Sequence, residues 1–250
     1  MWIKGEAITY PNEIDKETRD FIEKHEFTKR DFTTVDPSNL YDLMNPNGVI
    51  RNTLLPWCEV PINIPHKDIY KEASHLLETG CFTAHRRKSS GWLSLTIHGL
   101  SSVHTNVPHD YGLPDSWEDD ESTWTDIARF CPATVEWMKS EVRYEPFTRV
   151  RYMVVLPGGW LAPHTDTDTV PGLGATNVAI NNPDGCKLVM ENWGELPFTP
   201  GSAFKINTGY NHAVWNKSDT PRIHMIIDGD HSDYFKQKIL EGYKKCVLTK

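Results

Sequence analysis

Paired cysteines are absent from this sequence. The five cysteines are scattered along the chain, odd in number and never spaced as Cys-x-x-Cys: Cys58, Cys81, Cys131, Cys186 and Cys246. Structural zinc sites and the disulfide frameworks of small secreted domains depend on paired cysteines. The pattern therefore argues against both kinds of site and favours a reducing compartment.

Long hydrophobic runs and an excess of positive charge are also absent. No apolar run approaches the ~20 residues of a membrane-spanning helix, and no basic-then-apolar leader opens the chain. The formal net charge is −8, so we expect no general attraction to nucleic acid or to an anionic membrane. The nearest approach to a basic patch, residues 85–88, is most simply a solvated loop. We expect a soluble, cytoplasmic protein, and the sequence leaves its oligomeric state open.

The 250 residues are enough for one domain with a sizeable core. We expect residues 1–90 to form a helical and extended segment that packs on this core. Residues 91–230 are expected to form the core itself, and residues 231–250 to close the chain as a helix.

Helical periodicity is confined to short segments. Residues 15–25 and 66–80 place apolar side chains at helical spacing. Residues 124–143 do the same, but Pro132 inside them predicts a break or a restart. A last helix is expected within residues 233–245.

Short apolar segments broken by Gly, Pro and Asn dominate the second half of the chain. The expected strands are residues 91–99, 147–156, 160–165, 177–181, 187–191, 203–207, 212–216 and 222–228. The sequence Pro183-Asp184-Gly185 predicts a hairpin between two of them. Many short strands separated by turns indicate a mainly β protein with flanking helices and a double-stranded β-helix (jelly roll) core.

A metal-ligand pattern lies on these strands. His164 and Asp166 are two residues apart, so one strand end presents both side chains to the same side, and His212 supplies a second imidazole from another strand. Two neutral nitrogens and one carboxylate can hold Fe(II) on one face, which leaves positions for a chelating co-substrate and O₂. The alternative is that His-x-Asp occurs by chance and that His212 is an ordinary half-buried histidine.

Arg222 lies ten residues beyond His212, and we expect it on the adjacent antiparallel strand. A guanidinium in an otherwise apolar strand needs an anion, and its fork suits a carboxylate. The alternative is a structural salt bridge to an internal Asp or Glu.

Residues 91–228 resemble the aspartyl/asparaginyl β-hydroxylase family of Fe(II)/2-oxoglutarate oxygenases. The ordered set of motifs is specific, although no single piece is. The matching pieces are Pro157-Gly158, Pro163-His164-Thr165, Asp184-Gly185-Cys186-Lys187, Pro200-Gly201, His212-Ala213-Val214-Trp215 and Pro221-Arg222-Ile223.

The resemblance implies a dioxygenase that hydroxylates an amino-acid side chain with O₂ and releases succinate and CO₂, with ascorbate helpful in vitro. It implies His164, Asp166 and His212 as the iron ligands, Arg222 on the far carboxylate of 2-oxoglutarate, and Trp92 beside this co-substrate. Asn177 stands where members often carry a histidine near 2-oxoglutarate.

Two departures bear on the substrate. Met153 stands where a serine hydroxyl can support the co-substrate, and Gly174-Ala175-Thr176 lacks an arginine that helps protein Asp/Asn hydroxylases to hold an acidic substrate. The resemblance therefore implies as substrate either an Asp or Asn side chain in a peptide or protein, or a free amino acid such as proline.

Several roles stay open at this stage. Arg149 and Arg151 either meet a ligand carboxylate or pair with acids, and His224 either lines the cavity or is a satisfied core histidine. A non-catalytic jelly-roll module that senses 2-oxoglutarate remains an alternative to an enzyme. A cupin-type isomerase or hydrolase usually shows a His-x-His pair, which this chain lacks.

Overall fold

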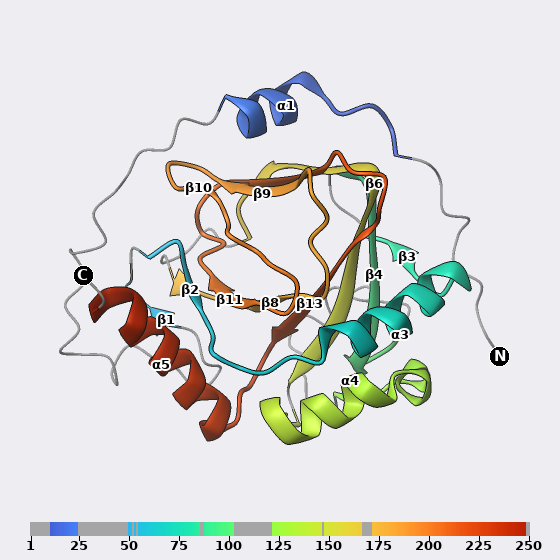
Figure 1. Cartoon of the computed structure of the whole chain (residues 1–250), viewed down its shortest axis with the longest axis vertical. Coiled ribbons are helices and arrows are strands. Elements are labelled where there is room, and N and C mark those ends of the chain that lie inside the picture. Colours follow the sequence, from blue (N-terminus) through green and yellow to red (C-terminus); the bar gives the residue numbers. More distant parts are fainter. Residues whose placement is uncertain are drawn as a thin grey trace, which may run out of the picture.

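The computed structural model describes residues 11–24, 50–51, 53, 55–85, 88–102, 122–146, 148–166 and 172–248. Figure 1 shows an antiparallel β core with helices around it. The helical elements are α1 (Lys16–Glu23), α3 (His66–Glu78), the 3₁₀ helix η4 (Asp126–Phe130), α4 (Pro132–Trp137), the π-helical turn η5 (Met138–Val142) and α5 (Asp233–Leu248). The strands are β1 (Ile50–Arg51), β2 (Trp57–Glu59), β3 (Thr83–Ala84), β4 (Ser89–Gly99), β5 (Thr123–Trp124), β6 (Arg149–His164), β7 (Gly172–Leu173), β8 (Thr176–Ala179), β9 (Cys186–Met190), β10 (Gly194–Glu195), β11 (Ala203–Ile206), β12 (His212–Asn216) and β13 (Arg222–Asp228).

The main sheet curls over into two facing layers. Its strand order is β10-β9-β12-β6-β13-β8-β11-β2, and β4 also pairs with β6. The small layer contains β10, β9 and β12, and the large layer contains β13, β8, β11 and β2, with β6 passing from one to the other (Figure 1). The predicted jelly-roll core with flanking helices is confirmed.

A glycine corner lets β6 serve both layers. Residues up to Val155 pair with β13, and residues from Trp160 onward pair with β12. Between them Gly158 has φ +76, which side chains rarely adopt, and a Cβ on Gly159 would stand 2.8 Å from the Leu156 carbonyl oxygen. The sequence predicted two strands here. The structure has one bent strand, because the glycines bend the chain without ending its pairing.

Two predicted pairings are wrong. The hairpin at Pro183-Asp184-Gly185 does not form, because β8 pairs with β11 and β13 while β9 pairs with β10 and β12. This turn carries the chain between the layers. Similarly, β12 and β13 are not adjacent, since β6 lies between them. The same turn residues are compatible with a hairpin and with a crossover between layers. Which connection forms depends on the strands with which the flanking segments pair.

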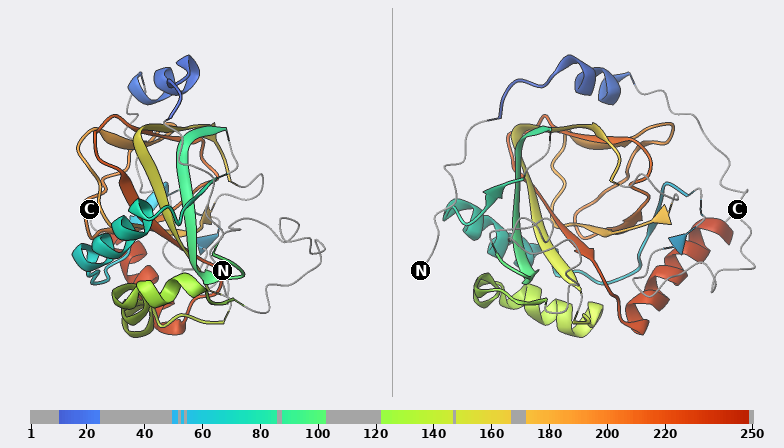
Figure 2. Two further views of the ribbon diagram at one scale, coloured as in Figure 1. Left: turned by 90° about the vertical axis from the view of Figure 1, so that its right-hand side faces the viewer. Right: turned by 180° about the vertical axis from the view of Figure 1, so that it is seen from behind.

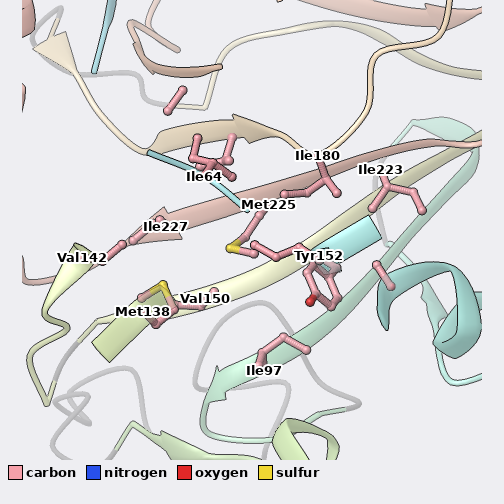
Figure 3. Close-up of a cluster of buried hydrophobic side chains, with 14 of the residues drawn as sticks. Ile64, Ile97, Met138, Val142, Val150, Tyr152, Ile180, Ile223, Met225 and Ile227 are labelled. Carbon is pink, nitrogen blue, oxygen red and sulfur yellow. The ribbon is translucent and has the colours of Figure 1, made fainter. Parts of the chain in front are cut away.

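Hydrophobic side chains fill two separate cores. One lies between the layers and includes Val155, Leu188, Phe198, Phe204 and Val214. The other lies between the large layer and the helices α3, α4 and α5, on the opposite face of β4, β6 and β13. Figure 3 shows part of this second core, in which strand side chains meet those of η5.

The helices cover the outer faces of the sheet, as the side and rear views show (Figure 2). The predicted helices form as α1, α3 and α5, and Pro132 divides the expected helix at 124–143 into η4, α4 and η5. In the small layer Ile22 of α1 packs against Val189 and Ala213. No helix in the described part of the chain is long and apolar enough to cross a membrane. The division at residues 90 and 230 stays a prediction, although β2 joins the main sheet beside β11.

Candidate functional site

His164, Asp166 and His212 converge at one end of the barrel. His164 ends β6 and His212 begins β12, and the two residues are direct partners in the antiparallel register. Each of the three side chains offers one ligand atom, and these atoms all lie within 4.8 Å of one another. Asp166 places one carboxylate oxygen 3.7 Å from His164 Nε2 and the other 3.9 Å from His212 Nε2. The structure therefore brings together the three side chains that the sequence analysis selected.

Backbone carbonyls determine which nitrogen of each imidazole faces Asp166. His164 Nδ1 lies 2.7 Å from the Ala162 carbonyl oxygen, and His212 Nδ1 lies 2.9 Å from that of Tyr210. A carbonyl oxygen only accepts, so each Nδ1 carries the hydrogen and donates it. In the neutral rings both Nε2 lone pairs are then free of protons and turned to the carboxylate, which is the arrangement that metal-ligating histidines use.

The donor set suits a divalent transition metal with open positions. Two imidazole nitrogens and one carboxylate are the ligands of non-haem Fe(II) sites that leave one side free. Asp166 is held near the others because its backbone N–H donates to the Thr208 carbonyl oxygen at 2.9 Å. The His212 side chain is 8% exposed, whereas those of His164 and Asp166 are 22% and 35% exposed, so the group is reachable from outside.

Arg222 begins β13 and is buried inside the barrel. Within the described part of the chain no Asp or Glu forms an ion pair with it, and its Nε is buried without a hydrogen-bond partner. Burial lowers the pKa of its guanidinium to about 10, so it stays charged at neutral pH. A structural salt bridge therefore does not explain this arginine. A buried cation whose described neighbours supply no anion fits the carboxylate of a bound acid.

Asn177 and His224 form a chain of contacts to Arg222. The Arg222 guanidinium lies 2.8 Å from His224 Nδ1, and Asn177 Oδ1 lies 2.7 Å from the same nitrogen. His224 has no exposed surface, and burial, followed by the charge of Arg222, holds its pKa well below the usual range. Asn177 thus touches His224, and whether it also touches a ligand stays a prediction.

Trp92 lies level with Arg222 across the sheet. Val155 on β6 is the register partner of Trp92 on one side and of Arg222 on the other. Partners in antiparallel strands point to the same face, so all three face the core between the layers. The indole packs edge-on to His85 with ring centroids 4.0 Å apart. Its predicted place beside a co-substrate remains a prediction.

Arg149 and Arg151 pair with an acid that the sequence analysis did not select. Arg149 donates to both carboxylate oxygens of Asp228 at 2.8 and 2.9 Å, and Arg151 donates to one of them at 2.8 Å. Burial alone would raise the pKa of Asp228, but the two guanidinium groups outweigh it and lower the pKa to about 2. The period-2 pattern of β13, which puts Asp228 on the same face as Arg222, was the available signal.

Comparison with known proteins identifies the family of the chain. The family model described as aspartyl/asparaginyl beta-hydroxylase matches residues 66–232. The match covers more than half of the chain, so the chain belongs to the aspartyl/asparaginyl β-hydroxylase family and is a 2-oxoglutarate-dependent hydroxylase. The predicted family is thereby confirmed. No curated protein sequence matches the chain.

Several solved structures are distantly similar. A Pseudomonas putida prolyl-4-hydroxylase has 12% identity and a TM-score of 0.41, over 79% of this chain and 100% of that chain. The prolyl hydroxylase of Trichoplax adhaerens, in complex with a hypoxia inducible factor peptide, has 12% identity and a TM-score of 0.43, over 82% and 91%. The viral collagen prolyl hydroxylase of Paramecium Bursaria Chlorella virus-1, in its 2OG complex, has 12% identity and a TM-score of 0.39, over 70% and 96%. The assignment to the family rests on the sequence match alone.

Proposed function

We propose that this protein is an Fe(II)- and 2-oxoglutarate-dependent dioxygenase that hydroxylates an amino-acid side chain. His164, Asp166 and His212 hold the iron, and Arg222 takes the distal carboxylate of 2-oxoglutarate. The observation that carries the proposal is the convergence of three ligand atoms within 4.8 Å of one another in a barrel that also buries an arginine with no acidic partner among the described residues.

The residues around the metal have separate tasks. The Ala162 and Tyr210 carbonyls hold the two imidazoles with Nε2 turned inward, and Asp166 supplies the negative charge that a divalent cation needs. Arg222 neutralises a carboxylate in an interior where an unpaired charge costs several kcal/mol. When bound, iron supplies the activation of O₂ that couples conversion of 2-oxoglutarate to succinate and CO₂ with hydroxylation. The residues of the chain bind and orient the reactants and exclude water from them.

The substrate is proposed as either an Asp or Asn side chain in a peptide or protein, or a free amino acid such as proline. The family description supports the first class. The absence of an arginine from Gly174-Ala175-Thr176 supports the second, because an acidic side chain would have one cation fewer to bind.

Metal dependence tests the reaction. Purified protein is incubated with Fe(II), ascorbate and 2-oxoglutarate, and succinate is measured with each free amino acid and with peptides containing Asp, Asn or Pro. We expect a chelator to abolish succinate release and excess Fe(II) to restore it. A protein that binds 2-oxoglutarate but releases no succinate with any substrate would be the binding module instead of an enzyme.

Arg222→Met tests the site of the co-substrate. Loss of a charge-assisted contact is expected to raise the KM for 2-oxoglutarate about 10- to 100-fold. Metal affinity, measured by titration with Co(II), should stay close to that of the wild type because Arg222 is not a ligand. Equal losses of metal and 2-oxoglutarate binding would count against the assigned role.

A further inference from the structure

His224 shares the interior of the barrel with Arg222. The two residues are two apart on β13, so they face the same side. The His224 and Phe198 rings form a T-shaped contact with centroids 4.7 Å apart, and the Arg222 guanidinium lies 5.7 Å from the centroid of the Phe198 ring. His224 is therefore a neighbour of the guanidinium inside the core between the layers.

The arginine determines where His224 carries its hydrogen. A guanidinium only donates, so His224 Nδ1, 2.8 Å away, must accept. Burial and the nearby charge keep the ring neutral. A neutral imidazole has one N–H, which is then at Nε2. Asn177 lies 2.7 Å from Nδ1 through Oδ1, and since two acceptors repel, its amide turns the NH₂ end to the ring.

The resulting Nε2–H of His224 is an unsatisfied donor. It is buried without a hydrogen-bond partner among the described residues. The Asn181 backbone lies close enough to act as an acceptor that partly offsets the fall in the pKa of His224, but it makes no hydrogen bond of acceptable geometry with Nε2. The cross-strand partners of His224, Met153 and Ala179, offer no polar group. A buried donor without a partner is destabilising unless a ligand bonds to it.

Two buried donors on β13 lack a partner among the described residues. Arg222 Nε and His224 Nε2 are both buried, both lack a partner among the described residues, and one belongs to a cation. A carboxylate has the matching charge and two acceptor oxygens.

We propose that His224 is a co-substrate-binding residue, whose Nε2–H donates to the same 2-oxoglutarate carboxylate that Arg222 neutralises. Asn177 is then a positioning residue that fixes the imidazole from its Nδ1 side. This inference rests on the proposed function and adds a second donor to its co-substrate site.

A pair of amide substitutions separates the two ring nitrogens. His224→Gln places an amide nitrogen near the place of Nε2, whereas His224→Asn places an amide near Nδ1 and leaves nothing at Nε2. The affinity for 2-oxoglutarate is measured by calorimetry on Mn(II)-loaded protein. We expect His224→Gln to stay within about 3-fold of the wild type and His224→Asn to bind about 10- to 100-fold more weakly.

A shorter keto acid is the matched ligand control. 2-Oxobutyrate keeps the metal-chelating end of 2-oxoglutarate and lacks the distal carboxylate. If His224 donates to that carboxylate, the wild type and both variants should bind 2-oxobutyrate with equal affinity. The proposal is overturned if His224→Asn keeps 2-oxoglutarate binding while His224→Gln loses it, because the ring would then act only through Nδ1.

The wild-type chain supplies a measurement that does not depend on the folding of a variant. In Zn(II)-loaded, ¹⁵N-histidine-labelled protein, saturation with 2-oxoglutarate should shift the Nε2 signal of His224 and protect its hydrogen from exchange. An unchanged signal at saturation overturns the proposal. Failure of the wild type to bind 2-oxoglutarate overturns the proposed function as well. Binding that is lost in Arg222→Met but kept in His224→Asn leaves the function intact and removes His224 from it.

Discussion

Lys205 on β11 is a fully buried cation on the outer face of the large layer. Its Nζ donates to the Gly174 carbonyl oxygen at 2.6 Å and lies 3.1 Å from His231 Nε2. Burial lowers the pKa of Lys205 to about 7, against small opposing influences of Cys58 and Asp228. Burial and then Lys205 lower the pKa of His231 to about 3, so His231 accepts as a neutral ring. The hydrogen bond from Lys205 to Gly174 joins β11 to the residues just before β8.

We predict that Lys205→Met removes part of the pH dependence of stability. Above pH 7 the folded chain loses the Lys205 proton, while the unfolded chain keeps it up to the ordinary value of 10.5. The unfolded state then binds more protons, so the free energy of unfolding rises with pH in this window. Urea denaturation between pH 7 and 8 should show a smaller slope in Lys205→Met, because titration of the unfolded cysteines, whose ordinary pKa is about 8.5, contributes equally in both proteins. Equal slopes would contradict a depressed pKa.

Whether the position of a single residue could be predicted depended on how far it lies in the sequence from the residues that it contacts. His164 and Asp166 could be placed together because strand parity is a local rule. The ion pairs of Arg149 and Arg151 with Asp228 span 79 and 77 residues and depend on the register of β6 against β13. The residue pattern of neither strand, taken by itself, predicts how the two strands are aligned. The contact of Asn177 with His224 depends in the same way on the pairing of β8 with β13.

Among the elements, β6 has the largest influence on the site. Its first part holds Val155 beside Arg222, and its last residue is the proposed ligand His164. The bend at Gly158 and Gly159 therefore sets the distance between the guanidinium and the proposed metal ligands.

Alanine at the two glycines of this bend should have different effects. Among the described residues nothing lies within 4 Å of a Cβ on Gly158, so Gly158→Ala costs only its backbone strain, about 1–2 kcal/mol. A Cβ on Gly159 meets the Leu156 and Ser90 carbonyl oxygens at 2.8 and 3.1 Å, so the backbone must shift. We expect Gly159→Ala to weaken Co(II) binding as well as stability. An unchanged Co(II) affinity in Gly159→Ala would show that the bend does not position His164.

Helices and turns that depend on neighbouring residues could be predicted from the sequence, but the pairing of the strands could not. The segment 66–80 gives α3 because its apolar spacing and its terminal glycine lie within the helix or next to it. The turn at Pro183-Asp184-Gly185 was also found, but its role was not. Whether it joins paired strands or crosses between layers depends on β11, β12 and β13, which lie beyond it in the chain.

At the scale of the whole molecule, α5 joins the end of the described chain to the edge of the large layer. It packs on β2, which pairs with β11 as the last strand of the sheet. The approach is close because Gly242 faces the backbone of β2: a Cβ there would stand 1.8 Å from the Glu59 carbonyl oxygen. Behind this contact Phe235, Ile239 and Tyr243 complete the core under the large layer.

Gly242→Ala should reveal how much this docking contributes. Inside a free helix the change would stabilise by about 0.5–1 kcal/mol, because alanine is the better helix former. The contact with Glu59 reverses the sign, since α5 must move away from β2 and uncover the core behind it. We expect a loss of about 2 kcal/mol or more in urea denaturation, in the range of overpacked cores. Gly80→Ala is the control: its φ of +72 strains alanine, but no atom in the described part of the chain lies within 4 Å of the added carbon. A Gly242→Ala protein as stable as the wild type would show that α5 can shift away from β2 without cost.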